Sequence, residues 1–434
     1  MKQKINIVWF RNDLRVRNNE ALYKACQDKL PVVGVYFFDP AHYATTNYGF
    51  KKTEKFRARF ILESIQELKE NLAAINIPLH VKLVSPDQGF LEISKNFDIR
   101  GIFLQKEWTS EEVATEQEIQ KTIPPTGWHR FYQQFLFHPD DFPYPDVQFL
   151  PEVFTEFRKK CEKFSRVRTS IPIPTKRPDE NLSHIQYNLP SLSDLGLEEF
   201  DKDPRSAFPF KGGENQAWKR IEDYFWETKK LQYYKKTRNG LVGTDYSSKL
   251  SPWLANGCIS TVDIYWEVKR FEKEIKKNQD TYWLIFELIW RDYFKYVSQK
   301  HGNKIFFQGG ILNKDYEWKN NEKAFQQWIN GNTNEDFVNA NMIELKETGF
   351  MSNRGRQNVN SFWAKEWHQD WRKGAAYFES MLIDYDVHSN WGNWMYNSGV
   401  GNDPRDRKFN IKGQAERYDA NGKYQRLWLQ ESLF

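Results

Sequence analysis

Short apolar runs alternate with amphipathic stretches over the first 135 residues of the chain. The runs INIVWF, VVGVYFF, LHVKLV and IRGIFL are rich in the β-branched and aromatic residues that buried strands favour. Between two of these runs, apolar residues recur at helical spacing, namely Phe56, Phe60, Ile65, Leu68 and Leu72. This alternation predicts a doubly wound parallel sheet, so residues 1–135 are expected to form an α/β domain.

The pattern changes twice after this region. From residue 131 to 210 the periodicity fades and 10 of the 18 prolines gather, which predicts a connector with little regular structure over residues 136–210. After residue 211 the stretches QAWKRIEDYFWETKKLQYY, TVDIYWEVKRFEKEI and TYWLIFELIWRDYFKYV have helical periodicity. Residues 211–434 are therefore predicted to form an all-α domain.

Composition narrows the class of protein. The 434 residues fit two domains, because single cores rarely grow past about 250 to 300 residues. The three cysteines are far apart, so neither a disulfide framework nor a metal site is expected. The apolar run IVWF is followed at once by charged RNDLRVR, and no stretch approaches about 18 apolar residues. We expect a soluble, cytoplasmic protein without membrane contact, associated with the nucleoid if its source is bacterial.

The net charge and the glycine motifs do not identify the ligand. The formal charge of +5 favours an anionic partner, although a solvated basic surface explains it equally well. Neither GxGxxG after the first strand nor GxxxxGK[ST] occurs, so a phosphate cradled in the standard way is not expected in the α/β domain.

The run ELIWRD places three functional groups on one face of a predicted helix. Glu287, Trp290 and Arg291 are spaced i, i+3 and i+4, so a carboxylate, an indole and a guanidinium would line one surface. An exposed salt bridge beside a core tryptophan is the plainer interpretation of the same spacing.

The segment GTDYSSKLSPWLANG gathers hydroxyl groups before a helix that is predicted to begin near Ser251. Thr244, Ser247, Ser248 and Ser251 provide hydroxyls, and the helix start provides free backbone N–H groups. Both suit a phosphate or pyrophosphate. An ordinary helix cap followed by a polar loop explains the pattern as well.

Two further segments, TGFMSNRGRQNVN and IDYDVHSNWGN, place polar groups between aromatic-rich helices. Burying Arg356 or Asp384 without a partner would cost several kcal/mol, so such groups pair with one another or contact a polar ligand. Asp386 and Asn390 are one helical turn apart and could present a carboxylate and an amide to a ring with donors and acceptors, such as a flavin. Surface capping is the alternative. His388, beside the acidic pair, is expected to titrate near neutrality.

Taken together and in this order, these segments resemble the cryptochrome/photolyase family over essentially the whole chain. KKTRNGLVGTDYSSKLSPWLANG, SNRGRQN and GNWMYNSGVGNDPR resemble its DASH branch. The resemblance implies one FAD per chain. Its phosphates would be held by Tyr234, Thr244, Ser247, Ser248, Leu250 and Ser251. Its ring would be surrounded by Glu287, Arg291, Asn353, Arg356, Asp384, Asp386 and Asn390, with Arg356 paired to Asp384.

The resemblance also implies an activity, namely that of a deoxyribodipyrimidine photolyase-type lyase. Blue light would drive electron transfer from reduced FAD to a cyclobutane pyrimidine dimer in DNA. Glu287 would hydrogen-bond the flipped dimer and Trp290 would stack on it. Asn390 matches the position that faces flavin N5, and Gln357 stands where (6-4) photolyases carry a histidine, so that second activity is not expected. Tyr396 replaces a second lesion-stacking tryptophan, which favours single-stranded DNA.

Tryptophan is the most unusual feature of the composition, with 17 in the chain. On pattern alone Trp318, Trp371 and Trp394 would be core aromatics. The resemblance instead makes them a chain of electron donors from the flavin to the surface, because an oxidised indole can be refilled by a neighbouring one.

The family's antenna chromophore sits in the α/β domain. We expect 5,10-methenyltetrahydrofolate, with Glu107 in QKEWTSEE as its acidic contact. A monomer is expected, and RNA binding stays open. The alternative function is a blue-light photoreceptor that uses the same flavin and tryptophans for signalling. Signalling members usually carry a long tail after the flavin domain, whereas this sequence stops at WLQESLF, so the enzyme is favoured. An aromatic-rich binding module without cofactor is a third possibility.

Overall fold

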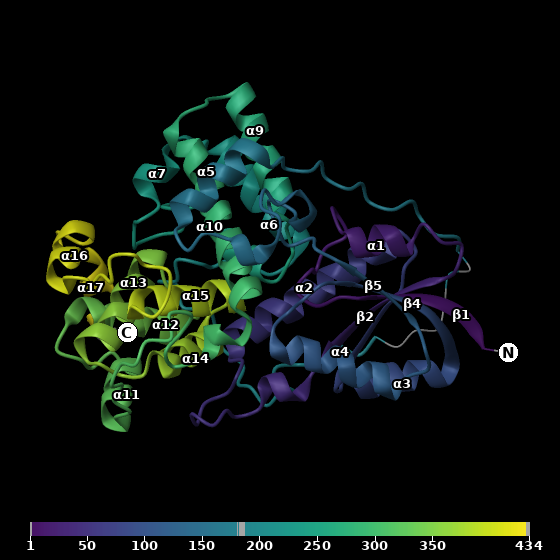
Figure 1. Cartoon of the computed structure of the whole chain (residues 1–434), viewed down its shortest axis with the longest axis horizontal. Coiled ribbons are helices and arrows are strands. Elements are labelled where there is room, and N and C mark those ends of the chain that lie inside the picture. Colours follow the sequence, from purple (N-terminus) through teal and green to yellow (C-terminus); the bar gives the residue numbers. More distant parts are fainter. Residues whose placement is uncertain (1, 180, 182–186, 431–434) are drawn as a thin grey trace.

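The computed structural model describes residues 2–179, 181 and 187–430. Figure 1 shows the N-terminal part as a sheet flanked by helices and the C-terminal part as a group of helices beside it. The sheet has five parallel strands in the order β3-β2-β1-β4-β5. Their bounds are β1 Gln3–Trp9, β2 Val32–Phe38, β3 Leu79–Leu83, β4 Phe97–Gln105 and β5 Gly127–Phe131. The predicted doubly wound parallel sheet is confirmed.

The alternation of side chains along the strands creates two cores, one on each face of the sheet. In β1, Ile5 and Ile7 enter one core and Val8 enters the other. Helices α1 (Glu20–Ala25) and α2 (Lys55–Ala73) cover the face of Val8, whereas α3 (Pro86–Asn96) and α4 (Ser110–Thr122) cover the opposite face. Figure 1 shows α1 and α3 on opposite sides of the strands.

Strand β5 is the one strand of this sheet that the hydrophobic pattern did not single out. Its sequence GWHRF lies at the sheet edge and its side chains are exposed or half-buried. Trp128 pairs with Ile102 of β4 in the ladder. An edge strand lacks the apolar run of a central strand, since only one side and part of one face are covered.

The turn after β1 joins the two domains. Arg15 is buried and its guanidinium donates to the backbone carbonyl of Gly257 at 2.9 Å. Asn18 donates to Ser260 at 2.8 Å, and the backbone N–H of Val16 donates to Glu214 at 2.9 Å. The charged run RNDLRVR, which has no phosphate-binding glycines, therefore holds the sheet against the helical domain.

The connector is less irregular than predicted. Besides short 3-10 turns at Pro139–Asp141 and Val147–Phe149, it contains the 11-residue helix α5 (Phe154–Phe164). Phe154 of α5 stacks on Trp290 with ring centroids 3.6 Å apart, so this helix packs on α10 of the helical domain. The expectation of little regular structure is wrong at α5, because one buried face with Phe154, Phe157 and Cys161 is enough to fix a short helix on a neighbour.

After residue 211 the described residues form helices and loops. The helices are α6 Glu214–Ile221, α7 Tyr234–Thr237, α8 Ser251–Ala255, α9 Thr261–Glu274, α10 Gln279–His301, α11 Glu322–Ile329, α12 Asp336–Thr348, α13 Asn353–Ser361, α14 Trp371–Met381, α15 Val387–Ser398, α16 Ile411–Tyr418 and α17 Lys423–Leu429. The predicted all-α domain is confirmed. No helix within the described ranges has the length and apolarity that a membrane span requires.

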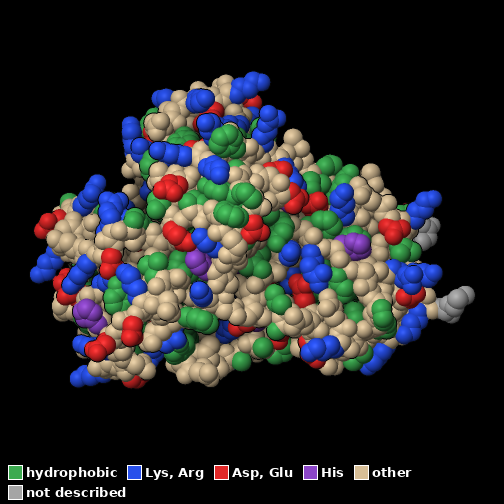
Figure 2. All heavy atoms as spheres, in the orientation of Figure 1, with side chains coloured by type: hydrophobic (Ala, Val, Ile, Leu, Met, Phe, Trp, Pro, Cys, Tyr) green, Lys and Arg blue, Asp and Glu red, His purple; other side chains and the backbone are tan. Residues whose placement is uncertain are grey.

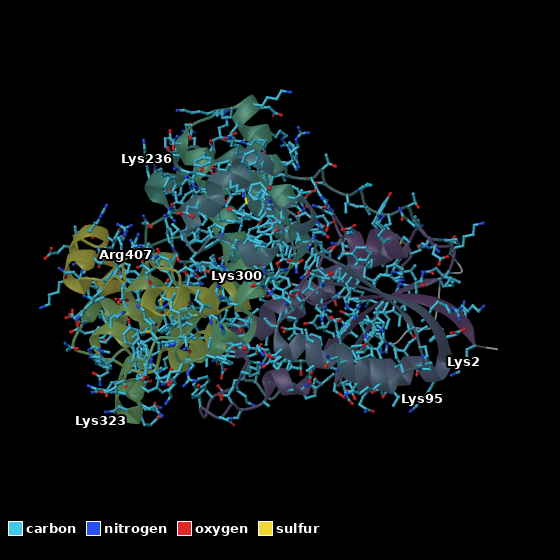
Figure 3. The ribbon with its side chains drawn as sticks, viewed as in Figure 1. Lys2, Lys95, Lys236, Lys300, Lys323 and Arg407 are labelled. Atoms are coloured by element: carbon cyan, nitrogen blue, oxygen red, sulfur yellow. The ribbon has the colours of Figure 1, made fainter. Side chains whose placement is uncertain are left out.

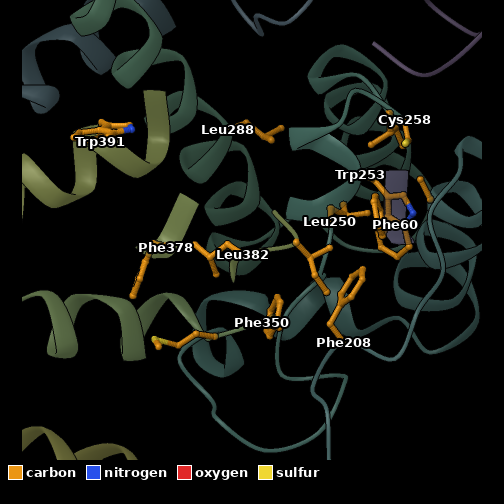
Figure 4. Packing of buried hydrophobic residues seen from close by; sticks show 14 of the residues in the cluster. Phe60, Phe208, Leu250, Trp253, Cys258, Leu288, Phe350, Phe378, Leu382 and Trp391 are labelled. Atoms are coloured by element: carbon orange, nitrogen blue, oxygen red, sulfur yellow. The ribbon is translucent and has the colours of Figure 1, made fainter. Parts of the chain in front are cut away.

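The cores of the two domains are continuous. Trp253 of α8 is fully buried and lies 5.2 Å from Phe208 of the connector and 6.2 Å from Phe60 of α2, measured between ring centroids. Figure 4 shows Trp253 beside Phe60, with Phe350, Phe378 and Leu382 further into the helical domain. Such a continuous core fixes the helical domain against the sheet, and it sets the walls of the site between them.

Candidate functional site

Arg356 and Asp384 form the buried ion pair that the family resemblance implied. Nη2 of Arg356 donates to both carboxylate oxygens of Asp384 at 2.8 Å, and Nε donates to the carbonyl of Met351 at 2.9 Å. The Asp384 side chain is 3% exposed and that of Arg356 is 22% exposed. The pair connects α13 to the segment before α15, and it satisfies two charges that would otherwise be costly to bury.

Asp386 caps α15 and also receives two cations from α10. Its carboxylate accepts the backbone N–H of Ser389 at 2.9 Å, as a helix N-cap does. Lys295 lies 3.0 Å and Arg291 3.5 Å from the same carboxylate. Burial alone would raise the pKa of Asp386, but the two cations hold that pKa far below its ordinary value. The charged form of Asp386 is therefore favoured by its surroundings.

Asn390 lies one turn further along α15. Its backbone N–H donates to the carbonyl of Asp386 at 2.8 Å, and its side-chain amide donates to the carbonyl of Ala375 in α14 at 3.0 Å. This second bond fixes the side-chain amide, and Asn390 is 8% exposed. Asn353, the other amide expected beside a ring, is exposed at the start of α13.

The hydroxyl-rich segment 244–251 is organised by Arg220 of α6. The guanidinium of Arg220 donates to the carbonyls of Thr244, Ser247 and Ser248 at 3.1, 3.2 and 3.0 Å. Within the described part of the chain, the hydroxyls of Ser247 and Ser248 take part in no hydrogen bond, so they are available to a ligand. Helix α8 begins at Ser251, as predicted, and Ser251 is exposed. Leu250 within this segment and Tyr234 before it are both buried, with 3% and 7% of their surface exposed.

Glu287, Trp290 and Tyr396 lie together where α10 and α15 meet. The Glu287 carboxylate forms an ion pair with Arg238 at 2.7 Å. Burial raises the pKa of Glu287, and the charge of Arg238 opposes that rise. Trp290 lies edge-on to Tyr396 at 6.0 Å between ring centroids. The Tyr396 hydroxyl accepts a hydrogen bond from Arg407 at 2.8 Å. Phe154 stacks on one face of Trp290, Phe294 lies 5.6 Å away between ring centroids, and the indole is half-buried.

Of the three tryptophans expected to carry electrons, Trp394 and Trp371 are fully buried and Trp318 is half-buried. The Trp394 ring rests on Gly374, where an added Cβ would lie 2.3 Å from Cη2 of the indole. Gly374 is one turn after Trp371 in α14, and both tryptophans are fully buried. The residue after Trp318, Lys319, pairs with Gln369 in an isolated bridge, which brings half-buried Trp318 beside the start of α14.

A cavity of about 470 Å³ lies between the two domains. Its lining includes the ends of β1 and β2, Glu107 after β4, and Arg291, Asp386 and His388 of the helical domain. Burial raises the pKa of Glu107 to about 7, although nearby Arg11 opposes this. The position at the carboxyl ends of parallel strands is where α/β domains generally bind ligands.

His388 does not titrate near neutrality, contrary to the expectation from sequence. Burial lowers the pKa of His388 well below its ordinary value, and the cation of Lys295 lowers it further. The imidazole stacks on Trp108 at 4.5 Å and its Nδ1 lies 2.7 Å from the hydroxyl of Ser298. The sequence showed the acidic neighbours of His388, but not the lysine from α10 that outweighs them.

Residues 6–178 match the family described as DNA photolyase, and residues 283–432 match the FAD binding domain of DNA photolyase. Cryptochrome DASH of Synechocystis sp. is 46% identical over 430 residues, which cover 98% of this chain and 87% of that protein. Cryptochrome DASH of Xenopus laevis is 44% identical over 433 residues, which cover 99% of this chain and 83% of that protein. The chain belongs to the DASH branch of the cryptochrome/photolyase family.

Solved structures agree with this membership. The crystal structure of the Synechocystis sp. PCC6803 cryptochrome has a TM-score of 0.93 at 44% identity and covers 99% of this chain and 89% of that one. A photolyase from Sulfolobus tokodaii, described with two FAD molecules, has a TM-score of 0.78 at 23% identity, with 99% and 90% covered. The second comparison shows that the fold is shared.

The residues of this DASH family member fit the cofactor that its FAD-binding domain implies. Lys249, within segment 244–251, is 2% exposed and its ammonium group has no hydrogen-bond partner among the described residues. It rests on the rings of Tyr246 and Phe350 instead. A buried lysine, whose pKa is lowered well below its ordinary value by burial, and free hydroxyls in one segment suit an anionic pyrophosphate, which would favour the charged lysine. The fixed amide of Asn390 suits a ring edge with N–H and C=O groups.

Several residues that build this site were not found from the sequence. Lys295 is one turn after Arg291 on the same face of α10, which was a usable signal. The sequence gave no such signal for Arg238 or Arg220. The partner of Arg238, Glu287, lies 49 positions away in the chain, and Arg220 donates to backbone carbonyls up to 28 positions away. The residues predicted to bind FAD and DNA lie on α7, α8, α10, α13, α15 and the adjoining loops of the helical domain, whereas Glu107 follows β4 of the α/β domain.

Proposed function

We propose that the protein is a light-driven lyase that repairs cyclobutane pyrimidine dimers, preferentially in single-stranded DNA. The observation that carries this proposal is the group formed by Glu287, Trp290 and Tyr396, in which a carboxylate and a half-buried indole adjoin arginines. Bound FAD, when reduced and excited by blue light, would supply the electron that splits the dimer, and the electron would return to it afterwards.

Within this proposal, the protein positions the dimer and excludes water. The Glu287 carboxylate, paired with Arg238, would accept hydrogen bonds from base N–H groups. Trp290, which stacks on Phe154, would stack on the dimer with its opposite face. Asn390 and Asp386 would hold the ring edge of the cofactor. Arg356 and Asp384 would contact its other polar groups.

Arginine and lysine side chains around this group suit a nucleic-acid backbone. Figure 2 shows Lys and Arg gathered over the upper lobe that carries α5, α7 and α9. In Figure 3, Lys236 of α7 is labelled on the upper lobe, and Arg407 after α15 is labelled below it, beside the part that carries α13 and α16. Tyr396 offers a smaller stacking surface than an indole and its hydroxyl is engaged by Arg407, so little is present to compensate for unpairing a duplex. A single strand avoids most of that cost, which is a few kcal/mol.

The test is anaerobic blue-light repair of a thymine dimer in a single-stranded and in a duplex oligonucleotide, with the absorption spectrum recorded beforehand. Restored thymines in the single strand alone are expected. Glu287→Gln should weaken dimer binding by about tenfold or more, because a hydrogen bond to a charged group contributes about 1.5 to 3 kcal/mol. Glu274→Gln, which alters an exposed glutamate paired with Arg270, should leave repair unchanged. If the protein is yellow and photoreducible but repairs neither substrate, the repair function is refuted and the blue-light photoreceptor is the function that is left.

We further propose that the interdomain cavity holds 5,10-methenyltetrahydrofolate as antenna, with the Glu107 carboxylate accepting N–H groups of the pterin. Because the pKa of Glu107 is raised to about 7, its carboxylate is lost as the pH falls through 7. Antenna affinity should therefore fall below pH 7, by up to about tenfold per pH unit, and be constant well above it.

Fluorescence titration with the folate between pH 5.5 and 8.5 measures this dependence. Glu107→Gln should abolish the pH dependence and lower affinity above pH 7 by about tenfold or more, the effect of a lost charged hydrogen bond. Glu111→Gln is the matched control, since Glu111 lines the same cavity but is 66% exposed. Equal pH dependence in wild type and Glu107→Gln would exclude Glu107 as the pterin contact.

A further inference from the structure

Tyr316 lies next to Trp318, the outermost of the three tryptophans. The two rings are edge-on, with centroids 5.6 Å apart and an interplanar angle of 83°. Both side chains are half-buried. The indole N–H of Trp318 is buried and has no hydrogen-bond partner in the described ranges. An electron can therefore pass from the phenol to the indole by direct ring contact, whereas Trp318 has no protein group to take its proton.

The hydroxyl of Tyr316 has the proton acceptor that Trp318 lacks. It donates to Oδ2 of Asp406 at 3.3 Å, and the phenol oxygen accepts a hydrogen bond from Lys314 at 3.1 Å. Asp406 also pairs with Lys365, and its side chain is 43% exposed. A carboxylate at the hydroxyl can take the phenolic proton, and its exposure lets that proton pass on to water.

The electrostatics of the group favour a neutral product. Two lysines surround the phenol, because the ammonium group of Lys365 lies 5.3 Å from the Tyr316 ring centroid and that of Lys314 lies 5.4 Å from it. A positive charge left on the ring would be repelled by both cations. Loss of the proton together with the electron avoids that charge, so the transfer to Asp406 is what makes oxidation of Tyr316 favourable.

We propose that Tyr316 is the terminal electron donor of the tryptophan path, with Asp406 as its proton acceptor. The inference rests on photoreduction of the flavin through Trp394, Trp371 and Trp318, the path that the family resemblance implies. After Trp318 has given one electron inward, Tyr316 gives one electron to Trp318, its O–H bond breaks and the proton forms a new O–H bond on Asp406. Tyr316 is left as a neutral radical and Asp406 as a neutral carboxyl. An external thiol then returns a hydrogen atom to Tyr316, and Asp406 releases its proton to water.

A second tyrosine–tryptophan pair in the chain provides a matched control. Tyr265 of α9 lies edge-on to Trp266 at 5.2 Å, and the ammonium group of Lys269 lies 5.4 Å from the Tyr265 ring centroid. Within the part of the chain that the structure describes, the Tyr265 hydroxyl has no hydrogen-bonded carboxylate. It therefore shares the ring geometry and the cation of Tyr316, but not its proton acceptor or its position beside Trp318.

The experiment is transient absorption and electron paramagnetic resonance after a blue flash, on holoprotein with oxidised flavin. Wild type should show a tryptophan radical that converts to a neutral tyrosyl radical, and the conversion should be slower in D₂O. Tyr316→Phe should stop at the tryptophan radical. Asp406→Asn, which keeps the phenol but removes the base, should slow tyrosyl formation by about tenfold or more. Tyr265→Phe should behave as wild type.

The outcomes separate this inference from the function on which it rests. A tyrosyl radical of unchanged yield in Tyr316→Phe would overturn the assignment of Tyr316. A tryptophan radical in wild type without any tyrosyl radical would also overturn it, while leaving photoreduction intact. If a flavin-loaded wild type shows no protein radical at all, the tryptophan path itself is refuted. Equal flavin content and circular dichroism of the variants verify that each one is folded.

Discussion

Replacing Arg356 by alanine is expected to destabilise the protein by about 3 kcal/mol and to remove most of its flavin. The substitution leaves the Asp384 carboxylate, 3% exposed, without its cation. Breaking a buried pair by removing one partner costs about 3 to 5 kcal/mol, because a charge stays buried without compensation. The lower end applies here, since the Arg356 side chain is 22% exposed. Urea unfolding and the flavin absorbance per chain measure the two effects.

Two further variants test the cause of this loss. Arg356→Lys keeps the cation but not the fork of donors that reaches Asp384 and the Met351 carbonyl, so an intermediate loss is expected. Lys121→Ala removes an ion pair to Glu118 in which both partners are mostly exposed, and it should cost less than about 1 kcal/mol. If Arg356→Ala unfolds at the same urea concentration as Lys121→Ala, the buried pair contributes nothing specific.

Trp371→Phe is expected to slow light-driven reduction of the bound flavin by more than about tenfold. Trp371 is fully buried in α14, between the helix turn that supports Trp394 and the bridge that positions Trp318. Phenylalanine fills most of the space but is much harder to oxidise, and a rise of about 1.4 kcal/mol in the barrier already gives a tenfold loss. The rate of flavin bleaching under blue light with an external thiol measures the effect.

Trp328→Phe is the matched control for this path. Trp328 is fully buried and lies 6.1 Å from Trp394 between ring centroids, and its further indole neighbour is Trp363 at 4.9 Å, which is not one of the three tryptophans of the expected path. Photoreduction in Trp328→Phe should equal that of wild type. A larger loss in Trp328→Phe than in Trp371→Phe would show that electrons leave Trp394 through Trp363 instead, and that the assigned order of tryptophans is wrong.

The sequence by itself determined the layers of the fold. Alternating apolar residues such as Ile5, Ile7 and Val8 report which face of a strand is buried, and helical spacing reports the buried face of α2 or α10. These are local signals, so they survive without knowledge of the partner. The ordered motifs from RNDLR to GNWMYNSG likewise determined the family, because many separate runs match together.

The tertiary structure decided which groups meet. Glu287 pairs with Arg238, Asp386 with Lys295, and segment 244–251 with Arg220, and none of these partnerships follows from periodicity. The charge state of His388 depended on the same information, since burial and a lysine from another helix outweigh its acidic neighbours. A pattern along the chain specifies a face, whereas the partner on that face and the free energy of burying a charge are set by packing between distant segments.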